Sequence, residues 1–156
     1  MKNKSVIATV LAAGLCSAAA MQSAMAGESK TKPIPGIPSN SLELFGGKQV
    51  VHEWAVALFY YIMLDRRINW MFREFGNPER QIFLNTQLET MVLGGPNEYQ
   101  GASMAAAHAD LNINMEQFNA VVEAAYNACE RVNIHYWTCN QLIAALAPFT
   151  DDIVTR

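Results

Sequence analysis

The chain has 156 residues, of which 51% are hydrophobic and 16% are charged, and its formal net charge is −3. This length predicts a single domain. The balance of charge is slightly acidic and no basic stripe appears, which argues against nucleic acid as a partner.

Residues 1–26 are organised like a secretory signal peptide. A basic start precedes an apolar run over 6–20 that is too short to span a bilayer as a helix, and Ala24 and Ala26 supply the small residues of a cleavage site. An uncleaved anchor fits less well because charged and proline-rich sequence follows, and a lipoprotein site at Cys16 is disfavoured by the bulky residue before it. The sequence therefore predicts export, to the periplasm, of a mature chain without a membrane span.

Residues 27–40 are polar and rich in proline, which predicts a flexible linker before a globular domain over 41–156. A domain of about 115 residues can bury a core, particularly if a cofactor fills its centre. Cys129 and Cys139 both belong to this domain, and such a pair in an oxidising compartment is a disulfide candidate. A turn over 130–138 between antiparallel helices would bring the two cysteines close together.

Glycine and proline divide the domain into helical segments, and no convincing strand alternation appears, which predicts an all-α fold. Pro78 suits the first turn of one helix, and Asn114 suits the N-cap of another that has Glu116 and Gln117 in its first turn. The expected helices cover residues 48–64, 78–93, 102–111, 114–132 and 136–146.

The helix over 78–93 carries two amides on its apolar arc. Thr86, Gln87 and Thr90 fall on the opposite side of the helical wheel. Burying an unpaired amide costs about 1–3 kcal/mol, so the two amides either hydrogen-bond to the backbone or to each other, or face a polar ligand. The apolar arc consists of Gln81, Leu84, Asn85, Leu88, Met91 and Val92.

The run Leu-Gly-Gly-Pro-Asn-Glu-Tyr-Gln-Gly, from Leu93 to Gly101, is followed seven residues later by His108. Glycine supplies left-handed dihedrals where a helix ends, and proline prevents the helix from resuming. Met104, His108 and Leu111 then share one face of a short helix, which points the imidazole into an apolar wall. A lone histidine in such a place is often a satisfied core residue, although neutral imidazole is also a common metal ligand.

In this run, and in the segments around it, the sequence resembles the truncated haemoglobins of the first group, which are bacterial and protist globins with a shortened helical fold. The resemblance continues from the Gly-Gly turn at 46–47 through the aromatic run at 59–61 to 111–122 and 144–154. It implies a two-over-two helical sandwich around haem b, with His108 as the proximal ligand of the iron. No Cys-x-x-Cys-His motif occurs, which argues against c-type attachment of the haem.

The resemblance also implies the residues on the distal side of the haem. Counting back from Gly94, Gln81 and Asn85 match the two distal positions where this family commonly places polar side chains. A tyrosine that donates to bound ligand is usual near residue 60. Matching the Phe-Tyr pair selects Tyr60, whereas ungapped counting and the apolar stripe of the helix favour Phe59.

Further haem contacts are expected from the resemblance and from the apolar faces of the helices. Phe72 matches the aromatic residue that packs flat against the haem. The other expected contacts are Leu84, Leu88, Met104, Leu111, Ile113, Phe118 and Val122.

Glu89 departs from the family pattern, which usually has an apolar residue at this position along a route to the haem. The helical wheel places Glu89 at the edge of the apolar arc, from where its side chain can reach solvent. His52 and His135 match no ligand position of the family and are expected at the surface.

The function implied by the resemblance is binding of dioxygen or another diatomic ligand, nitric oxide or carbon monoxide, at the haem. The same site could detoxify nitric oxide if an external electron donor reduces the iron again, since no reductase domain or flavin motif occurs in the chain. One alternative is a peroxidase-like or redox haem enzyme in which Glu89 moves protons. Another is a protein that stores or delivers haem.

Overall fold

The computed structural model describes residues 37–156 except residue 75, and within this part the chain forms helices and no strands. The expected all-α fold is confirmed. The predicted signal peptide and most of the predicted linker lie outside the described residues. The helices are α1 (Ser41–Phe45), α2 (Gly47–Leu64), α3 (Asn69–Glu74), α4 (Pro78–Val92), α5 (Met104–His108), α6 (Met115–Arg131), α7 (Tyr136–Leu146), the 3₁₀ helix η1 (Ala147–Phe149) and α8 (Thr150–Ile153).

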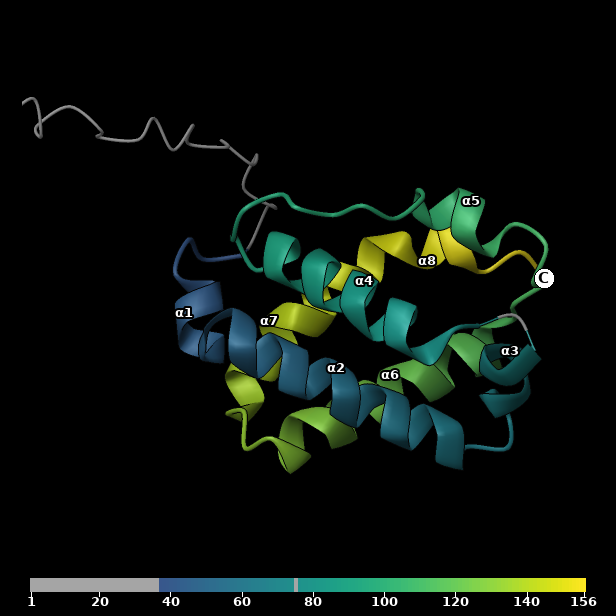
Figure 1. The fold of residues 1–156 in the computed structure, drawn as a ribbon, viewed down its shortest axis with the longest axis horizontal. Coiled ribbons are helices and arrows are strands. Elements are labelled where there is room, and N and C mark those ends of the chain that lie inside the picture. Colours follow the sequence, from purple (N-terminus) through teal and green to yellow (C-terminus); the bar gives the residue numbers. More distant parts are fainter. Residues whose placement is uncertain (1–36, 75) are drawn as a thin grey trace, which may run out of the picture.

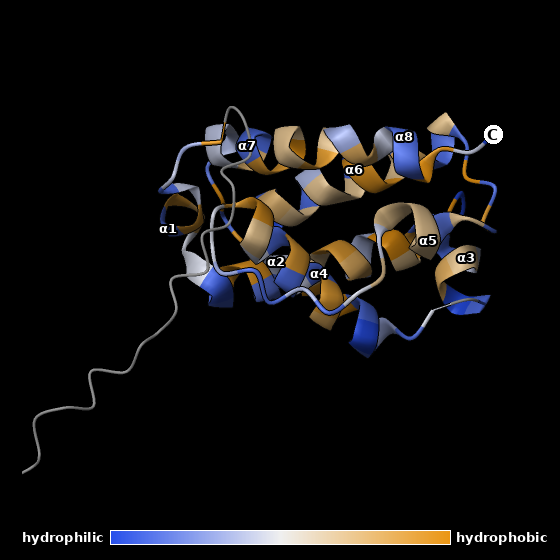
Figure 2. Ribbon diagram, turned by 90° about the horizontal axis from the view of Figure 1, so that it is seen from above, coloured by the Kyte–Doolittle hydropathy of each residue, from blue (hydrophilic) through white to orange (hydrophobic). Residues whose placement is uncertain are grey.

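Four helices form two layers. Helix α2 packs against both α4 and α6, and α7 packs against both α6 and α4. Seen from above, α2 and α4 form one layer, while α6 and α7 form the other (Figure 2). The short helices α5 and α8 contact each other near one end of this sandwich (Figure 1). No helix among the described residues is long and apolar enough to cross a membrane.

Glycines and helix caps set the ends of the first long helices. Gly46 has a φ of 103° and separates α1 from α2, and a Cβ at this position would lie 2.7 Å from a methyl carbon of Val50. Only glycine is accommodated there without strain. Helix α4 begins where the Asn77 side chain accepts a hydrogen bond of 2.9 Å from the Arg80 amide, and ends before Gly94, whose φ is 91°.

Helix α6 begins with the expected cap. The Asn114 side chain accepts from the Gln117 amide at 2.9 Å, and the Gln117 side chain accepts from the Asn114 amide at 3.0 Å. This reciprocal pair satisfies two backbone donors that a helix end otherwise leaves unpaired. At the other end of α6, Cys129 and Cys139 are joined across the turn to α7, with their Cα atoms 6.1 Å apart. That the protein carries this disulfide stays a prediction.

Buried polar contacts tie the layers together. The indole N–H of Trp54 in α2 donates to the carbonyl of Ala125 in α6 at 3.2 Å. The Ser41 hydroxyl in α1 donates to the side-chain carbonyl of Gln141 in α7 at 2.9 Å. Since buried donors without partners are costly, both bonds favour this one arrangement of the helices.

The wheel of α4 differs from the expectation of a single buried face. Thr86, Gln87 and Thr90 are all buried rather than turned to solvent. The two threonine hydroxyls donate to carbonyls one turn earlier, at 2.8 and 2.6 Å, and Gln87 accepts from the Gln100 amide at 3.2 Å. Helix α4 is therefore covered by protein on more than one side, and its polar residues are satisfied locally.

Candidate haem site

A cavity of about 380 Å³ lies between the two layers, and its wall is mostly apolar. Helices α2, α3, α4, α5 and α6 contribute to the wall, together with Tyr99 from the loop before α5 and residues of α7, η1 and α8. This volume falls in the range of about 300–1,000 Å³ typical of cofactor and small-molecule sites.

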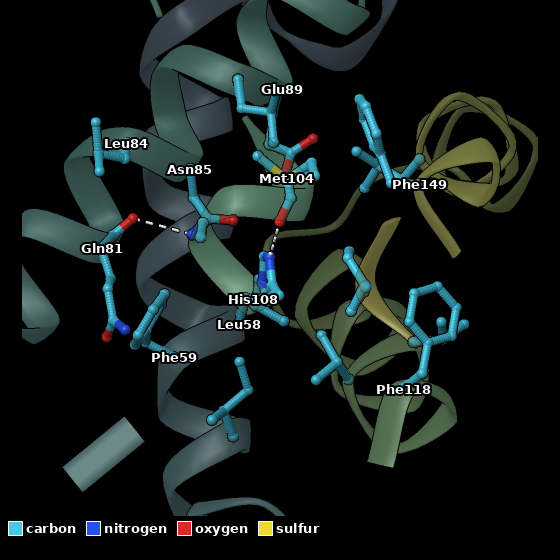
Figure 3. Close-up of a pocket in the computed structure, with 18 of the residues that line it drawn as sticks. Leu58, Phe59, Gln81, Leu84, Asn85, Glu89, Met104, His108, Phe118 and Phe149 are labelled. Atoms are coloured by element: carbon cyan, nitrogen blue, oxygen red, sulfur yellow. Dashed lines mark hydrogen bonds between the residues drawn. The ribbon is translucent and has the colours of Figure 1, made fainter. Parts of the chain in front are cut away.

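His108 is the last residue of α5 and lines this cavity. Its Nδ1 lies 2.7 Å from the backbone carbonyl oxygen of Met104 (Figure 3). Because a carbonyl oxygen can only accept, Nδ1 carries the proton in this bond. In the neutral imidazole, the other ring nitrogen, Nε2, then keeps its lone pair free, which is the state in which a histidine binds a metal, with its ring orientation fixed by the backbone.

Ten of the predicted haem contacts line the cavity with His108. They come from α2, α3, α4, α5, α6 and the loop before α6. They are Phe59, Phe72, Gln81, Leu84, Asn85, Leu88, Met104, Leu111, Phe118 and Val122.

Two predicted contacts do not line the cavity. Tyr60 is 48% exposed, and the Arg131 guanidinium carbon lies 4.5 Å from the centre of its ring. Phe59, at 4% exposure, faces inward instead and packs edge-to-face on Phe72 with ring centres 5.7 Å apart. Ile113 is buried outside the cavity, and its carbonyl accepts from the amides of residues 155 and 156 at 3.0 and 3.2 Å. One step along a helix turns a side chain by about 100°, which separates Tyr60 from Phe59.

The two amides of α4 both line the cavity but differ in their hydrogen bonds. Asn85 donates one N–H to the backbone carbonyl of Gln81 at 2.9 Å, which leaves its second N–H available. The side-chain carbonyl of Gln81 is buried without a hydrogen-bond partner among the described residues. The Gln81 amide packs so closely over Gly76 that a Cβ there would lie 2.6 Å from its oxygen. Asn85 can thus offer an N–H to a ligand, whereas the unpartnered buried atom of Gln81 is an acceptor oxygen.

Glu89 corrects the expectation of a solvent-facing carboxylate. It is 2% exposed, it lines the cavity, and its Oε2 has no hydrogen-bond partner among the described residues. Burial raises the pKa of Glu89 to about 8. The expectation that Glu89 reaches solvent was wrong because other segments cover the side of α4 that was expected to be exposed. Helix α7 packs against α4, and the loop that follows α4 bonds back to it through Gly95 and Gln100.

Several cavity residues were missing from the prediction. Trp54 and Ile62 belong to the predicted apolar stripe of α2, so helical spacing marked them as buried but not as cavity residues. Phe149 and Ile153 follow the last predicted helix; they lie within the range of the family resemblance, over 144–154, which did not mark them as cavity residues. Tyr99 also lines the cavity, while its hydroxyl donates to the Ala102 carbonyl at 2.9 Å.

The other two histidines lie outside the cavity wall. His52 is exposed, with its Nδ1 3.2 Å from the Thr86 hydroxyl. His135 is exposed too, and its Nδ1 accepts from the Trp137 amide at 3.2 Å to cap α7.

The residues present fit a haem. An apolar cavity between two helical layers suits a flat aromatic macrocycle, and His108 offers an oriented nitrogen to its iron. The unpartnered oxygens of Gln81 and Glu89 are what a polar or charged occupant of the cavity would meet.

Comparison with known proteins agrees with this site. A family model described as bacterial-like globin matches residues 40–155. A group 1 truncated hemoglobin of Tetrahymena thermophila is 39% identical over 82 residues, which are 52% of this chain and 66%, just under two thirds, of that protein. Another from Tetrahymena pyriformis is 34% identical over 87 residues, 55% of this chain and 70% of that protein.

Solved structures share the fold. The Fe(III) form of the truncated hemoglobin from Tetrahymena pyriformis superimposes with a TM-score of 0.70 at 22% identity, covering 74% of this chain and 98% of that one. The 2/2 hemoglobin from Synechococcus sp. PCC 7002, in the cyanomet state with covalently attached heme, gives 0.68 at 21% identity, with coverages of 74% and 98%. The chain thus has the two-over-two globin fold and belongs to the bacterial-like globins, among the group 1 truncated haemoglobins.

Proposed function

We propose that this globin is an exported protein that binds dioxygen, or another diatomic ligand such as nitric oxide or carbon monoxide, at a haem b held by His108. The observation that carries the proposal is the 2.7 Å bond from His108 Nδ1 to the Met104 carbonyl. This bond leaves Nε2 as the free nitrogen of a residue that lines an apolar cavity. The haem, when bound, supplies an iron site at which a diatomic ligand can be held.

The protein's own residues would exclude water and orient the ligand. Phe59, Phe72 and Leu58 line the cavity with apolar side chains, which favour a small, uncharged ligand over water. Asn85 and Gln81 supply amide donors, and a donor close to bound dioxygen slows its escape. With Phe59 inward, no hydroxyl comes from this position of α2, so the amides of α4 carry the polar contacts.

Nitric oxide detoxification is a reaction that the same site could perform. Dioxygen, nitric oxide and one electron combine to give nitrate, so an external one-electron donor is needed for each turnover. The buried carboxyl of Glu89 favours a second candidate, a peroxidase-like or redox enzyme, because acid–base groups in a haem cavity can move protons.

Export is supported by the signal-like organisation of residues 1–26. The juxtaposed Cys129 and Cys139 suit an oxidising compartment such as the periplasm. N-terminal sequencing of the protein recovered from the cell envelope should start after residue 26. Recovery of the full chain in the cytoplasmic fraction would contradict export.

The test of the site is optical. Wild-type protein given haem should show distinct absorption spectra in the ferric form, in the ferrous form and in the ferrous form under dioxygen. His108→Ala should lose stable haem binding, or give a spectrum that added imidazole restores. His52→Ala is the matched control and should keep the wild-type spectrum, since His52 is exposed outside the cavity. Iron ligation through His52 or His135 would overturn the proposal.

A further inference from the structure

The diatomic-binding site makes no use of Glu89, although Glu89 lines the same cavity as His108. Figure 3 shows the Glu89 side chain extending from α4 into this space, where Asn85 and His108 also point. Glu89 as a residue is 2% exposed, and its Oε2 is unpartnered among the described residues. A buried carboxyl without partners is expensive to ionise, so its protonation depends on the other charges in the cavity.

No lysine or arginine of the described part of the chain lines this cavity. The residues of α2, α6 and α7 that line the cavity are apolar or aromatic and do not titrate near neutral pH. The titratable residues that share the wall with Glu89 are Tyr99, from the loop before α5, and His108. His52 of α2 contacts α4 at Thr86, which does not line the cavity.

Burial therefore decides the protonation of Glu89. Desolvation raises its pKa to about 8, and no attractive charge opposes that effect. In the haem-free protein near pH 7, about nine in ten molecules would hold the neutral acid, and a positive charge placed in the cavity would lower this fraction. Burial raises the pKa of the Tyr99 phenol, while the charge of Arg80 lowers it and the charge of Glu89 raises it.

We propose that Glu89 takes up a proton from solvent when the iron of a haem in this cavity is reduced, so that electron entry and proton entry are coupled. This inference rests on the proposed haem site. One electron comes from an external one-electron donor, which is oxidised, and the iron passes from ferric to ferrous. The proton forms the O–H bond of the Glu89 carboxylic acid, so the charge inside the cavity is unchanged overall.

The physical reason is mutual electrostatics in a poorly screened space. A ferric centre carries one more positive charge than a ferrous one, and that charge stabilises the Glu89 carboxylate. Two unit charges about 10 Å apart, at an effective dielectric constant of about 20, interact strongly enough to change a proton affinity roughly tenfold. By linkage, ionised Glu89 must then stabilise the ferric state to the same extent.

The measurable consequence is a midpoint potential that depends on pH. A tenfold change in proton affinity corresponds to about 59 mV for a one-electron couple. The potential of the wild-type holoprotein should fall by about this amount as the pH rises through the ionisation of Glu89. In Glu89→Gln, which keeps the shape of the side chain without its charge, this fall should disappear.

Spectroelectrochemical titration of the holoprotein between about pH 5 and about pH 10 tests the proposal. The matched control is Glu79→Gln, an exposed carboxylate at the start of the same helix, which should keep the wild-type pH dependence. Glu89→Leu should flatten the profile as Glu89→Gln does, which guards against a packing effect of one substitution. Equal pH dependence in wild type and in both neutral variants would overturn the proposal.

Infrared difference spectra of wild-type holoprotein provide a direct readout of the proton. Reduction should produce the carbonyl band of a protonated carboxylic acid, and Glu89→Gln should lack it. Absence of this band in wild type would contradict the inference even if neither variant folded. A chain that takes up no haem would contradict the proposed function and this inference together, whereas a haem protein with a pH-independent potential would contradict only the inference.

Discussion

The two walls of the cavity are built very differently. Helix α4, with 15 residues, packs on α2 and α7 and buries six of its residues, Thr86 to Thr90 and Val92. Helix α5, with five residues, buries none of them and contacts chiefly the short α8. The wall that would face the ligand is therefore fixed by the protein, while the wall that carries His108 has little protein packing of its own.

This difference suggests which parts of the site depend on the haem. Regions with few buried contacts open at low free-energy cost, and a ligand that binds the folded form stabilises them. Haem would thus order α5 by bonding to His108, whereas Asn85 and Gln81 would be in place beforehand.

The largest expected effect is the pH dependence of the free energy of unfolding that buried Glu89 in α4 introduces. Its pKa is about 8 in the folded protein against an ordinary value of 4.5, so between these values the folded state holds a proton that the unfolded state releases. The free energy of unfolding should then fall as the pH rises through this window, by about 1.4 kcal/mol per pH unit, and level off above it. Urea unfolding at several pH values should show this decline in wild type, and Glu89→Gln should remove it while Glu79→Gln does not.

Removal of haem should affect α5 alone among the cavity helices. Amide hydrogen exchange over 104–108 should accelerate about a hundredfold or more in the haem-free protein. This factor corresponds to a loss of about 2.7 kcal/mol from the free energy of local opening of α5. Residues 88–92 of α4 should keep their protection. Equal protection of α5 with and without haem would contradict the contrast between the two walls.

The disulfide between Cys129 and Cys139 joins α6 to α7, and neither cysteine lines the cavity. In the chain-entropy model, closing a loop with a sequence separation of 10 stabilises by roughly 2–3 kcal/mol. Replacing both cysteines with alanine should lower the free energy of unfolding by about this amount and leave the haem spectrum unchanged. Titration of the mature protein that finds two reactive thiols before any reductant is added would remove the disulfide prediction.

The smallest effect concerns the amide donors of α4. Asn85→Leu or Gln81→Leu should speed dioxygen release roughly tenfold, since one hydrogen bond of about 1.4 kcal/mol is lost, and carbon monoxide release should change less. Tyr60→Phe is the control and should leave both rates unchanged, because Tyr60 lies on the outer side of α2. A large acceleration in Tyr60→Phe without an effect in the amide variants would show that the donors are wrongly assigned.

The sequence predicted the long helices more closely than the short ones. The helix predicted over 136–146 matches α7, and that over 48–64 differs from α2 by one residue. Helices α1, α3 and α8 were not predicted, because four to six residues are too few to show a helical period or to be stable without tertiary packing.

The sequence could predict those residues of the candidate site whose orientation depends only on the periodicity of their own helix. His108, Asn85 and Phe59 follow from spacing on their own helices together with the family pattern. Glu89 and Ile113 do not, because their positions depend on segments far along the chain that cover α4 or hold the carbonyl of residue 113. Local periodicity carries no information about such coverage.

The contact between Gly76 and Gln81 has a consequence for how this pocket can vary between homologues or be redesigned. A methyl group at residue 76 would collide with both terminal atoms of the Gln81 amide, at 2.6 and 2.7 Å, and with the Phe72 carbonyl at 2.5 Å. The identity of residue 76 therefore limits which side chains residue 81 can present to a ligand. A directed-evolution library aimed at ligand affinity should keep Gly76 and vary residue 81, since the backbone carbonyl of Phe72 excludes a Cβ at residue 76 whichever side chain residue 81 carries.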